Sequence, residues 1–405
     1  MAWNGISQES TEQKTMQNFT FQNSTKVIFG KNTIAQLGDE SKPFGKKGLL
    51  IYGQGAIKKN GVYDQAVASL KAAGIEIVEF PGVRPNPVLS HTRDGISLAK
   101  KEKVDMLIAV GGGSVVDEAK AICAGACSSN DVWDFYTGKA APEKALPLMV
   151  VLTVAATGTE MNGGTVITNE ATDEKYGWGN PLLSPKVSIL DPTTTFSIGP
   201  KYTAYAAVDA VTHLLESYFT ADDPNTLLQD RYVEGIVKTI LDVTETMIKK
   251  PDDYEARAAF MWAATLAWNN IAPCGVGNWW CPNHLIGHSM SALFDTPHGA
   301  SLSIALSGWL PWYAEQGRVN VRQLAQFGKA VFDISEKDEK AAAELAIEAL
   351  RQWFRRIKSP TTLADIGIDA AGLERVAENV GACSPHWDLP QYDQPFVAAI
   401  LKRCR

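Results

Sequence analysis

The stretch Asp105-Met-Leu-Ile-Ala-Val-Gly-Gly-Gly-Ser114 decides the fold class. Its first part, residues 105–110, is a short apolar run, which is typical of a strand buried on both faces of a parallel sheet. Three glycines follow, and a helix is predicted from Ser114 to Cys127. Glycines at such a junction let the main chain approach a phosphate, and the helix start offers free N–H groups and the positive end of a dipole. The stretch therefore predicts a phosphate-binding turn, although a tight strand–helix turn without a ligand has the same pattern. It does not match the GxGxxG fingerprint of ordinary dinucleotide-binding domains.

The alternation of strand and helix continues on both sides of this stretch. Strands are predicted at 48–52, 75–80, 148–153 and 186–190, and helices at 64–73 and 90–102. Strands that alternate with helices build βαβ units and a mostly parallel sheet. We therefore expect residues 18–195 to form an α/β dinucleotide-binding domain.

Beyond Pro200 the strand signals stop. Helical periodicity predicts helices at 202–218, 225–249, 252–270, 282–294, 300–314, 319–332, 336–357 and 370–380. Prolines stand where several of these helices start or stop. The pattern predicts an all-α domain over residues 196–405, which is expected to carry a metal.

Length and composition set the broad class of the protein. A chain of 405 residues exceeds what one core usually serves, so two domains are expected. The net charge of −7 and the lack of a basic stripe disfavour a nucleic-acid partner. No apolar run is long enough to span a membrane, and the polar residues 1–17 read as a disordered leader rather than a secretory signal. Six cysteines are few for this length, which favours reduced thiols in a cytoplasmic enzyme.

Four residues of the helical half form a candidate metal site. Asp209 and His213 stand four apart on a predicted helix and therefore point to the same side. His284 lies on another predicted helix, and His298 follows a Pro-containing turn that could return it to the same place. Three imidazoles and one carboxylate form a donor set that Zn²⁺ and Fe²⁺ accept. For Asp209 and His213 alone, a polar pair on an amphipathic helix is the alternative, but their apolar neighbours make an unpaired carboxylate costly to bury. Cys281 is a minor candidate for the same metal, and His91 and His386 are expected to be structural or solvent-exposed.

A second glycine-containing loop, Gly53-Gln54-Gly55, follows the first predicted strand. In NAD sites a carboxylate commonly binds the ribose 2′-hydroxyl and repels a 2′-phosphate. This loop has no acid before Asp64, whereas Lys58 and Lys59 are available to a phosphate. The loop therefore favours NADP over NAD.

Taken in order, these motifs resemble those of the iron-containing (group III) alcohol dehydrogenases, over nearly the whole chain. Within that family the chain looks most like the NADPH-dependent aldehyde reductases and the butanol dehydrogenases. The matching elements are Ile28-Phe-Gly-Lys31, Tyr52-Gly-Gln-Gly55, Pro85-Asn-Pro87, Gly111-Gly-Gly-Ser-Val-Val-Asp117, Leu190-Asp-Pro192, Asp209-Ala-Val-Thr-His213, His284-Leu-Ile-Gly-His288 and Pro297-His-Gly299.

The resemblance implies a metal in a cleft between the two domains, with Asp209, His213, His284 and His298 as ligands. It places His288 near the nicotinamide without binding metal. It also implies a homodimer, in which the strand-like segment Phe19 to Phe29 could pair across the two copies. The implied cofactor-binding residues are Gly53, Gln54, Gly55, Asn86, Gly112, Gly113, Ser114, Asp117, Thr153, Thr157, Lys175 and His288.

One departure concerns the first loop, where close relatives have Gly-Gly-Gly-Ser and this chain has Gly53-Gln54-Gly55-Ala56. The missing serine hydroxyl removes one partner of a 2′-phosphate, so the preference for NADP is less secure and NAD is a possible alternative.

The sequence thus predicts an NADP-dependent alcohol dehydrogenase or aldehyde reductase that binds one divalent metal, Fe²⁺ or Zn²⁺. The metal is expected to polarise the substrate oxygen during hydride transfer, with His288 as the proton relay. An aromatic substrate pocket is expected from Trp178, Trp279, Trp280 and Phe294. Three alternatives stay open: a metal- and NAD-using lyase resembling dehydroquinate synthase, a polyol dehydrogenase, and a non-catalytic binding protein. Residues 260–300 contain no Lys or Arg, which counts against the lyase and its phosphorylated substrate.

Overall fold

The computed structural model describes residues 16–222 and 226–404. Most of the predicted leader, and Asn225 at the start of one predicted helix, lie outside these residues. Of the leader, Gln17 is described, and its main-chain N–H donates to the carbonyl oxygen of Gly275 at 3.0 Å.

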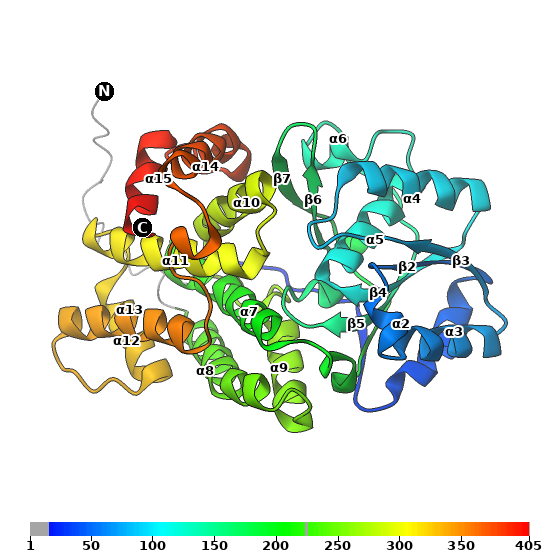
Figure 1. The fold of residues 1–405 in the computed structure, drawn as a ribbon, viewed down its shortest axis with the longest axis horizontal. Helices are drawn as coiled ribbons and strands as arrows, with labels where there is room; N and C mark the ends of the chain where they lie inside the picture. Colours follow the sequence, from blue (N-terminus) through cyan, green and yellow to red (C-terminus); the bar gives the residue numbers. More distant parts are fainter. Residues whose placement is uncertain (1–15, 223–225, 405) are drawn as a thin grey trace.

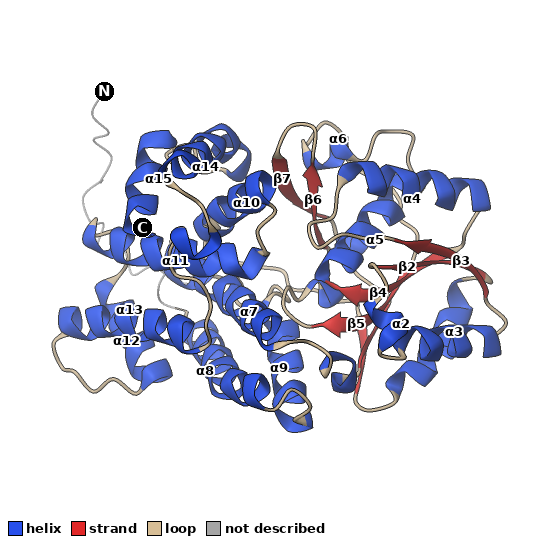
Figure 2. Cartoon of the chain, in the orientation of Figure 1, coloured by secondary structure: helices blue, strands red, loops and turns tan. Residues whose placement is uncertain are grey.

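A sheet of six parallel strands forms the core of the α/β half (Figures 1 and 2). Alternate residues of the central strands point to opposite faces, as the period of a strand requires. On one face, Leu49 and Leu107 pack with helices α4 and α5, and on the other, Leu50 and Ile108 pack with α3. The strands are β1 (Lys26–Phe29), β2 (Lys47–Tyr52), β3 (Glu76–Pro81), β4 (Met106–Gly112), β5 (Leu148–Val154) and β8 (Val187–Leu190), and the helices are α1 (Leu37–Ser41), α2 (Ala56–Lys59), α3 (Val62–Ala72), α4 (Leu89–Glu102), α5 (Gly113–Ala126) and α6 (Trp133–Tyr136).

The strand order β1-β8-β5-β4-β2-β3 reverses between β2 and β4. From β2 the chain first adds β3 on one side and then crosses to add β4 on the other. In open parallel sheets, ligands bind at the carboxyl ends of the strands beside such a reversal. The two glycine-containing loops, after β2 and after β4, stand at this point.

A two-stranded antiparallel hairpin, β6 (Gly164–Asn169) and β7 (Glu174–Gly179), was not predicted. Its strands carry glycines and charged residues, which weaken the usual strand signal. It lies between α6 of the α/β half and α10 of the helical half (Figure 1). The predicted strand-like segment was also too long, because only Lys26–Phe29 joins the sheet and the described residues before it form no strand.

The helical half contains only helices among its described residues, so the predicted fold class, a mostly parallel α/β domain followed by an all-α region, is confirmed. Helix α7 is buried almost along its whole length because its own residues are apolar on most sides. The last helix, α15, was not predicted. No helix within the described ranges is both long and apolar enough to cross a membrane. The helices are α7 (Pro200–Thr220), α8 (Leu227–Lys249), α9 (Tyr254–Ala267), α10 (Pro282–Phe294), α11 (His298–Glu315), α12 (Val321–Phe332), α13 (Glu339–Arg356), α14 (Ala370–Cys383) and α15 (Gln394–Leu401).

Candidate active site in the cleft

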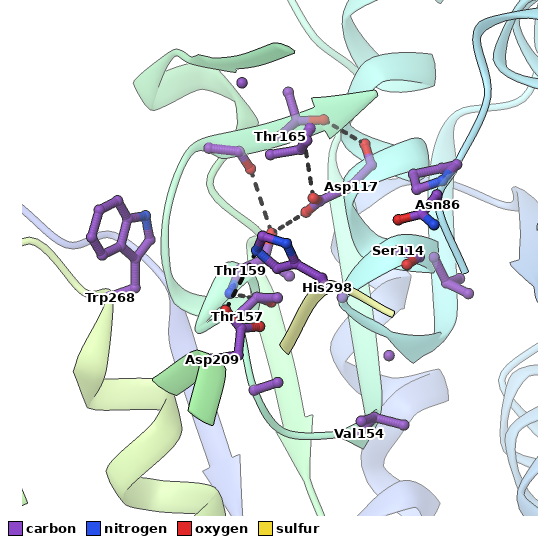
Figure 3. A pocket seen from close by; sticks show the side chains of 18 of the residues that line it. Asn86, Ser114, Asp117, Val154, Thr157, Thr159, Thr165, Asp209, Trp268 and His298 are labelled. Carbon is purple, nitrogen blue, oxygen red and sulfur yellow. Dashed lines mark hydrogen bonds and ion pairs between the residues drawn. The ribbon is translucent and has the colours of Figure 1, made fainter. Parts of the chain in front are cut away.

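A cleft of ≈ 1190 Å³ is lined by the loops at the carboxyl ends of β2, β4 and β5 and by residues of α7, α10 and α11 (Figure 3). This volume exceeds that of a typical small-molecule pocket and is sufficient for a dinucleotide together with a small substrate. Apart from Gly55, every residue predicted to bind the metal or the cofactor lines it.

The glycine turn after β4 is packed tightly against its neighbours. A Cβ atom at Gly112 would meet Val154 at 2.9 Å, and one at Gly113 would meet Thr157 at 2.7 Å. Strand β4 runs through Gly112, and helix α5 begins at Gly113 with no side chain capping its first N–H groups. Close packing alone therefore requires these glycines, and the uncapped helix start faces the cleft beside Ser114. The Ser114 hydroxyl donates to the carbonyl oxygen of Pro85.

Asp117 reaches the edge of the cleft, but its carboxylate is engaged within the protein. It is the fifth residue of α5, not part of the first turn, and accepts from Thr159 Oγ1 at 2.7 Å and from the Val166 N–H at 3.2 Å (Figure 3). Burial raises the pKa of Asp117 to about 6. The predicted cofactor residue thus attaches hairpin strand β6 to helix α5.

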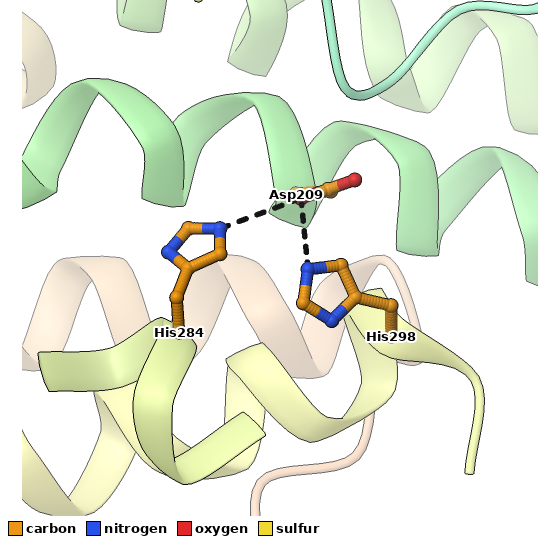
Figure 4. A group of neighbouring side chains, drawn as sticks. All are labelled: Asp209, His284 and His298. Atoms are coloured by element: carbon orange, nitrogen blue, oxygen red, sulfur yellow. Dashed lines mark ion pairs between the residues drawn. The ribbon is translucent and has the colours of Figure 1, made fainter. Parts of the chain in front are cut away.

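Three of the four predicted metal ligands form one tight group. One ligand atom each from Asp209, His284 and His298 lies within 4.8 Å of the other two. Oδ1 of Asp209 is 3.9 Å from His284 Nε2 and 3.6 Å from His298 Nε2 (Figure 4). Helix α7 supplies the carboxylate, α10 supplies one imidazole, and the first residue of α11 supplies the other.

His213 stands beside this group without joining it. Its Nδ1 lies 3.4 Å from Asp209 Oδ1, and its ring centroid is 4.5 Å from that of His284. Burial lowers the pKa of His213 to about 3 and that of His298 well below its ordinary value, so both rings are neutral. Burial acts in the same direction on His284, but its contacts with Asp209 and Glu216 outweigh it and raise the pKa to about 9.

The residues of this group fit a metal ion. Three buried polar atoms that face one another in this group have no hydrogen-bond partner among the described residues: Asp209 Oδ1, His213 Nδ1 and His284 Nε2. Unsatisfied buried polar atoms cost stability, and a cation in their midst removes that cost. A carboxylate with neutral imidazoles is also the donor set of catalytic zinc and iron sites.

Glu216 is a site residue that the sequence analysis missed. It is fully buried, and its Oε1 contacts both the main-chain N–H of His284 at 2.9 Å and His284 Nδ1 at 3.0 Å. A carboxylate behind a ligand histidine fixes the orientation of the ring and makes the other nitrogen a better donor. The spacing could have revealed it, because Asp209, His213 and Glu216 follow one another at i, i+4 and i+7 on one helix face.

Replacing Glu216 by glutamine should lower the metal affinity roughly 10–100-fold, because the neutral amide cannot hold His284 in the same way. Metal affinity is measured by competition with a chelator. Glu234→Gln is the matched control, since Glu234 is also buried but accepts from Tyr218 and Gln326 and has no contact with a histidine of the group. Equal losses in both variants would contradict a specific role for Glu216.

His288 is held by the hairpin. Its Nδ1 lies 3.1 Å from the carbonyl oxygen of Lys175 in β7, so Nδ1 carries the proton and Nε2 is the acceptor. Burial, together with the charge of Lys175, lowers the pKa of His288 well below its ordinary value. Burial also lowers the pKa of Lys175, to about 8, and its Nζ donates to Asn86 Oδ1 at 3.0 Å.

The aromatic lining differs from the prediction. Of the four predicted aromatic residues, only Trp178 lines the cleft. Two tryptophans that were not predicted, Trp268 and Trp387, line it as well. The ring of Trp268 is 4.5 Å from that of His213, and the ring of Trp387 is 4.9 Å from that of His288. His386 also lines the cleft, where it stacks on Tyr176 at 4.0 Å, and its side chain is exposed, as predicted. The residues wrongly predicted to line the cleft are Trp279, Trp280 and Phe294.

The first loop presents Gln54 to the cleft, but not Lys58. Lys58 Nζ is 3.6 Å from a carboxylate oxygen of Glu79 and lies over the ring of Tyr63. Glu79 also accepts hydrogen bonds from Tyr52 at 2.5 Å and from Tyr63 at 2.6 Å. The lysine that was expected to be available to a phosphate is therefore already paired with an acid.

Two family profiles together match most of this chain. Residues 24–192 match that of the iron-containing alcohol dehydrogenases, and residues 203–403 match the C-terminal region of the Fe-containing alcohol dehydrogenase family.

Individual relatives agree with these profiles. The chain is 40% identical over 390 residues to the probable NADH-dependent butanol dehydrogenase 1 of Bacillus subtilis, an alignment that covers 96% of this chain and 99% of that protein. It is 35% identical over 361 residues to the NADPH-dependent aldehyde reductase YqhD of Escherichia coli, covering 88% and 91%. The crystal structure of NADH-dependent butanol dehydrogenase A from Thermotoga maritima superposes with a TM-score of 0.92 at 44% identity, covering 97% of this chain and all of that one (100%).

Proposed function

Since this chain belongs to the iron-containing alcohol dehydrogenase family, and is therefore an oxidoreductase with named alcohol dehydrogenases and aldehyde reductases as relatives, we propose that it transfers a hydride between NADP(H) and an aldehyde or primary alcohol. One observation supports this proposal above all: the Asp209, His284 and His298 group opens into the same cleft as the uncapped start of α5. Hydride transfer requires the hydride donor and a polarised carbonyl group to lie in contact, which a shared cleft permits.

The proposed metal ligands are Asp209, His213, His284 and His298. A metal bound there would act as a Lewis acid on the substrate oxygen, and the cofactor would supply or accept the hydride. His213 is included because its buried Nδ1 is unpartnered among the described residues and faces Asp209. The donor set accepts either Fe²⁺ or Zn²⁺.

The cofactor is proposed to lie along the strand ends. The N–H groups at the start of α5 would bind its diphosphate, since a helix start is a favourable anion site. Thr153 at the end of β5 and Thr157 in the loop after it offer hydroxyls, and the hydrogen-bonded pair Lys175 and Asn86 also lines the cleft. Gln54 lies in the loop after β2, where an acid would repel a 2′-phosphate.

His288 is the proposed proton relay. Its neutral ring presents Nε2 as an acceptor while Nδ1–H stays bonded to the main chain. The ring can therefore take the proton that leaves an alcohol, or return one to a reduced carbonyl. Trp268 and Trp387 line the cleft beside the histidines and exclude water from the reacting atoms.

The assay that tests this proposal mixes the metal-loaded protein with NADPH or NADH and a panel of aliphatic and aromatic aldehydes. We expect NADPH to be oxidised, which is measured as a loss of its absorbance. With primary alcohols and NADP we expect the reverse reaction. An unchanged absorbance with every aldehyde and both cofactors, from protein that contains its metal, would refute the proposed reaction.

The cofactor preference is tested by Gln54→Asp. The added carboxylate should lower kcat/KM for NADPH relative to NADH about tenfold or more, because it repels the 2′-phosphate and accepts from a 2′-hydroxyl. Gln65→Asp on α3 is the control, since it adds the same charge at an exposed position that does not line the cleft. A ratio that changes equally in both variants would show that Gln54 does not face this part of the cofactor.

We further propose that residues 18–195 and 196–405 form two domains. We also propose that two copies of the chain associate through β1. Strand β1 is the edge of the sheet, and Phe29 at its end is 39% exposed. Exposed edge strands are templates for pairing with another chain. Sedimentation of the purified protein at the mass of a single chain would exclude the dimer.

A further inference from the structure

We propose that Glu216, Cys281 and His284 form a second metal site, which binds Zn²⁺ or another thiophilic divalent ion. One ligand atom from each of these residues lies within 4.8 Å of the other two. The site shares His284 with the proposed catalytic metal, but it does not depend on the reaction that the enzyme performs.

The His284 ring separates the two sites. Its Nε2 faces Asp209, whereas its Nδ1 faces Glu216 at 3.0 Å. The Glu216 carboxylate is fully buried at the start of α10 and also accepts from Asn283 Nδ2 at 3.2 Å. Cys281, the residue before α10, completes the group with its thiol.

The donor set is one that zinc prefers. Thiolate, imidazole and carboxylate ligands together suit tetrahedral Zn²⁺, which holds three protein ligands and one further position in many sites. Two ligands at the usual Zn–N and Zn–O lengths lie about 3.3–3.5 Å apart, so the Nδ1–Oε1 pair at 3.0 Å needs to open by only a few tenths of an ångström to admit an ion. Cys281 lines the cleft, so an ion has a path to the site from solvent.

Binding displaces two protons to solvent, one from the Cys281 thiol and one from His284 Nδ1. With both sites filled, the His284 ring would be an imidazolate that holds one ion on each of its two nitrogens. The ion also takes the place of the hydrogen bond by which Glu216 orients His284. Excess zinc is therefore expected to inhibit an enzyme that one metal ion activates.

Cadmium titration tests the site because a cadmium–thiolate bond absorbs in the ultraviolet. Protein loaded with one equivalent of Zn²⁺ is titrated with Cd²⁺, and we expect the thiolate band to saturate at roughly one further ion per chain. The band should be absent in Cys281→Ser and retained in Cys127→Ser, which removes an exposed thiol of α5's C-terminal end. No band in the wild type, or an unchanged band in Cys281→Ser, would overturn the proposal.

A further variant separates this site from the one at Asp209. Asp209→Asn should keep the thiolate band, because Asp209 is not a ligand of the second site. Loss of the band in Asp209→Asn would place Cys281 on the first metal and overturn the assignment.

The cysteine variants also test the expected inhibition. Each protein is compared with its own rate without added ion, and excess Zn²⁺ should inhibit wild type and Cys127→Ser but not Cys281→Ser. Equal inhibition of all three would show that the inhibitory ion binds elsewhere.

Discussion

Replacing His284 by alanine should remove the metal from the purified protein and lower kcat/KM about a thousandfold or more. The substitution deletes Nε2, which faces Asp209, and leaves the buried Asp209 and Glu216 carboxylates without the ring that separates them. Both carboxylates then repel each other through a protein interior of low dielectric, which disfavours the arrangement that the metal needs.

Metal content by elemental analysis and steady-state rates with NADPH are measured on the same preparation. His91→Ala is the control histidine, because His91 bonds Glu118 and stacks on Phe80 outside the cleft. It should keep both its metal and its activity. If His284→Ala kept full metal content and full activity, the metal centre would have to be placed elsewhere.

Replacing Asp117 by alanine should lower the free energy of unfolding by about 3–5 kcal/mol, because it takes from a buried lysine the stronger of the two carboxylates that act on it, Asp117 and Glu160. Lys120 is fully buried, and its Nζ donates to Thr159 Oγ1 at 2.7 Å, which in turn donates to Asp117 Oδ1. Burial lowers the pKa of Lys120 to about 8, so its charge is already costly in the native protein. The same substitution frees the Val166 N–H and loosens hairpin strand β6 from α5.

Denaturant unfolding measures the change in stability. Asp117→Asn should lose less than Asp117→Ala, because the amide oxygen still accepts one of the two hydrogen bonds. Glu344→Ala, on the exposed face of α13, is the control and should change stability by less than about 0.5 kcal/mol. A loss in Asp117→Ala as small as that in Glu344→Ala would show that the Thr159 and Lys120 network does not depend on Asp117.

The sequence predicted those parts of the fold whose signals are local. The apolar run before Gly111 and the periodicity of α10 gave strands and helices within a few residues of those observed. The hairpin was missed because its strands gain stability from contacts distant in sequence, such as the one between Val166 and Asp117. The glycine turn was located correctly, but only the structure shows that Val154 and Thr157 require its glycines.

In the candidate site, too, the features with a local sequence signal were predicted and those that depend on contacts distant in sequence were not. Helical spacing predicted that Asp209 and His213 share a face, and the structure adds that His213 stands outside the tight group formed with His284 and His298. Trp268 and Trp387 could not be assigned to the cleft from their positions in the chain, since Trp268 directly follows α9 and Trp387 ends a short 3-10 helix (Ser384–Trp387) after α14. The ion pair between Lys58 and Glu79 could not be predicted either, because the two residues are distant in sequence and meet only in the folded chain.

The contact between His288 Nδ1 and the carbonyl of Lys175 has a consequence for how this enzyme can be altered. A main-chain acceptor is retained whatever side chain stands at position 175. The residue therefore performs two tasks that mutation can separate: its side chain can be exchanged to change the contact with Asn86, while the tautomer of His288 is preserved. Because the charge of Lys175 also lowers the pKa of His288, a neutral side chain at position 175 should raise that pKa without changing which ring nitrogen carries the proton.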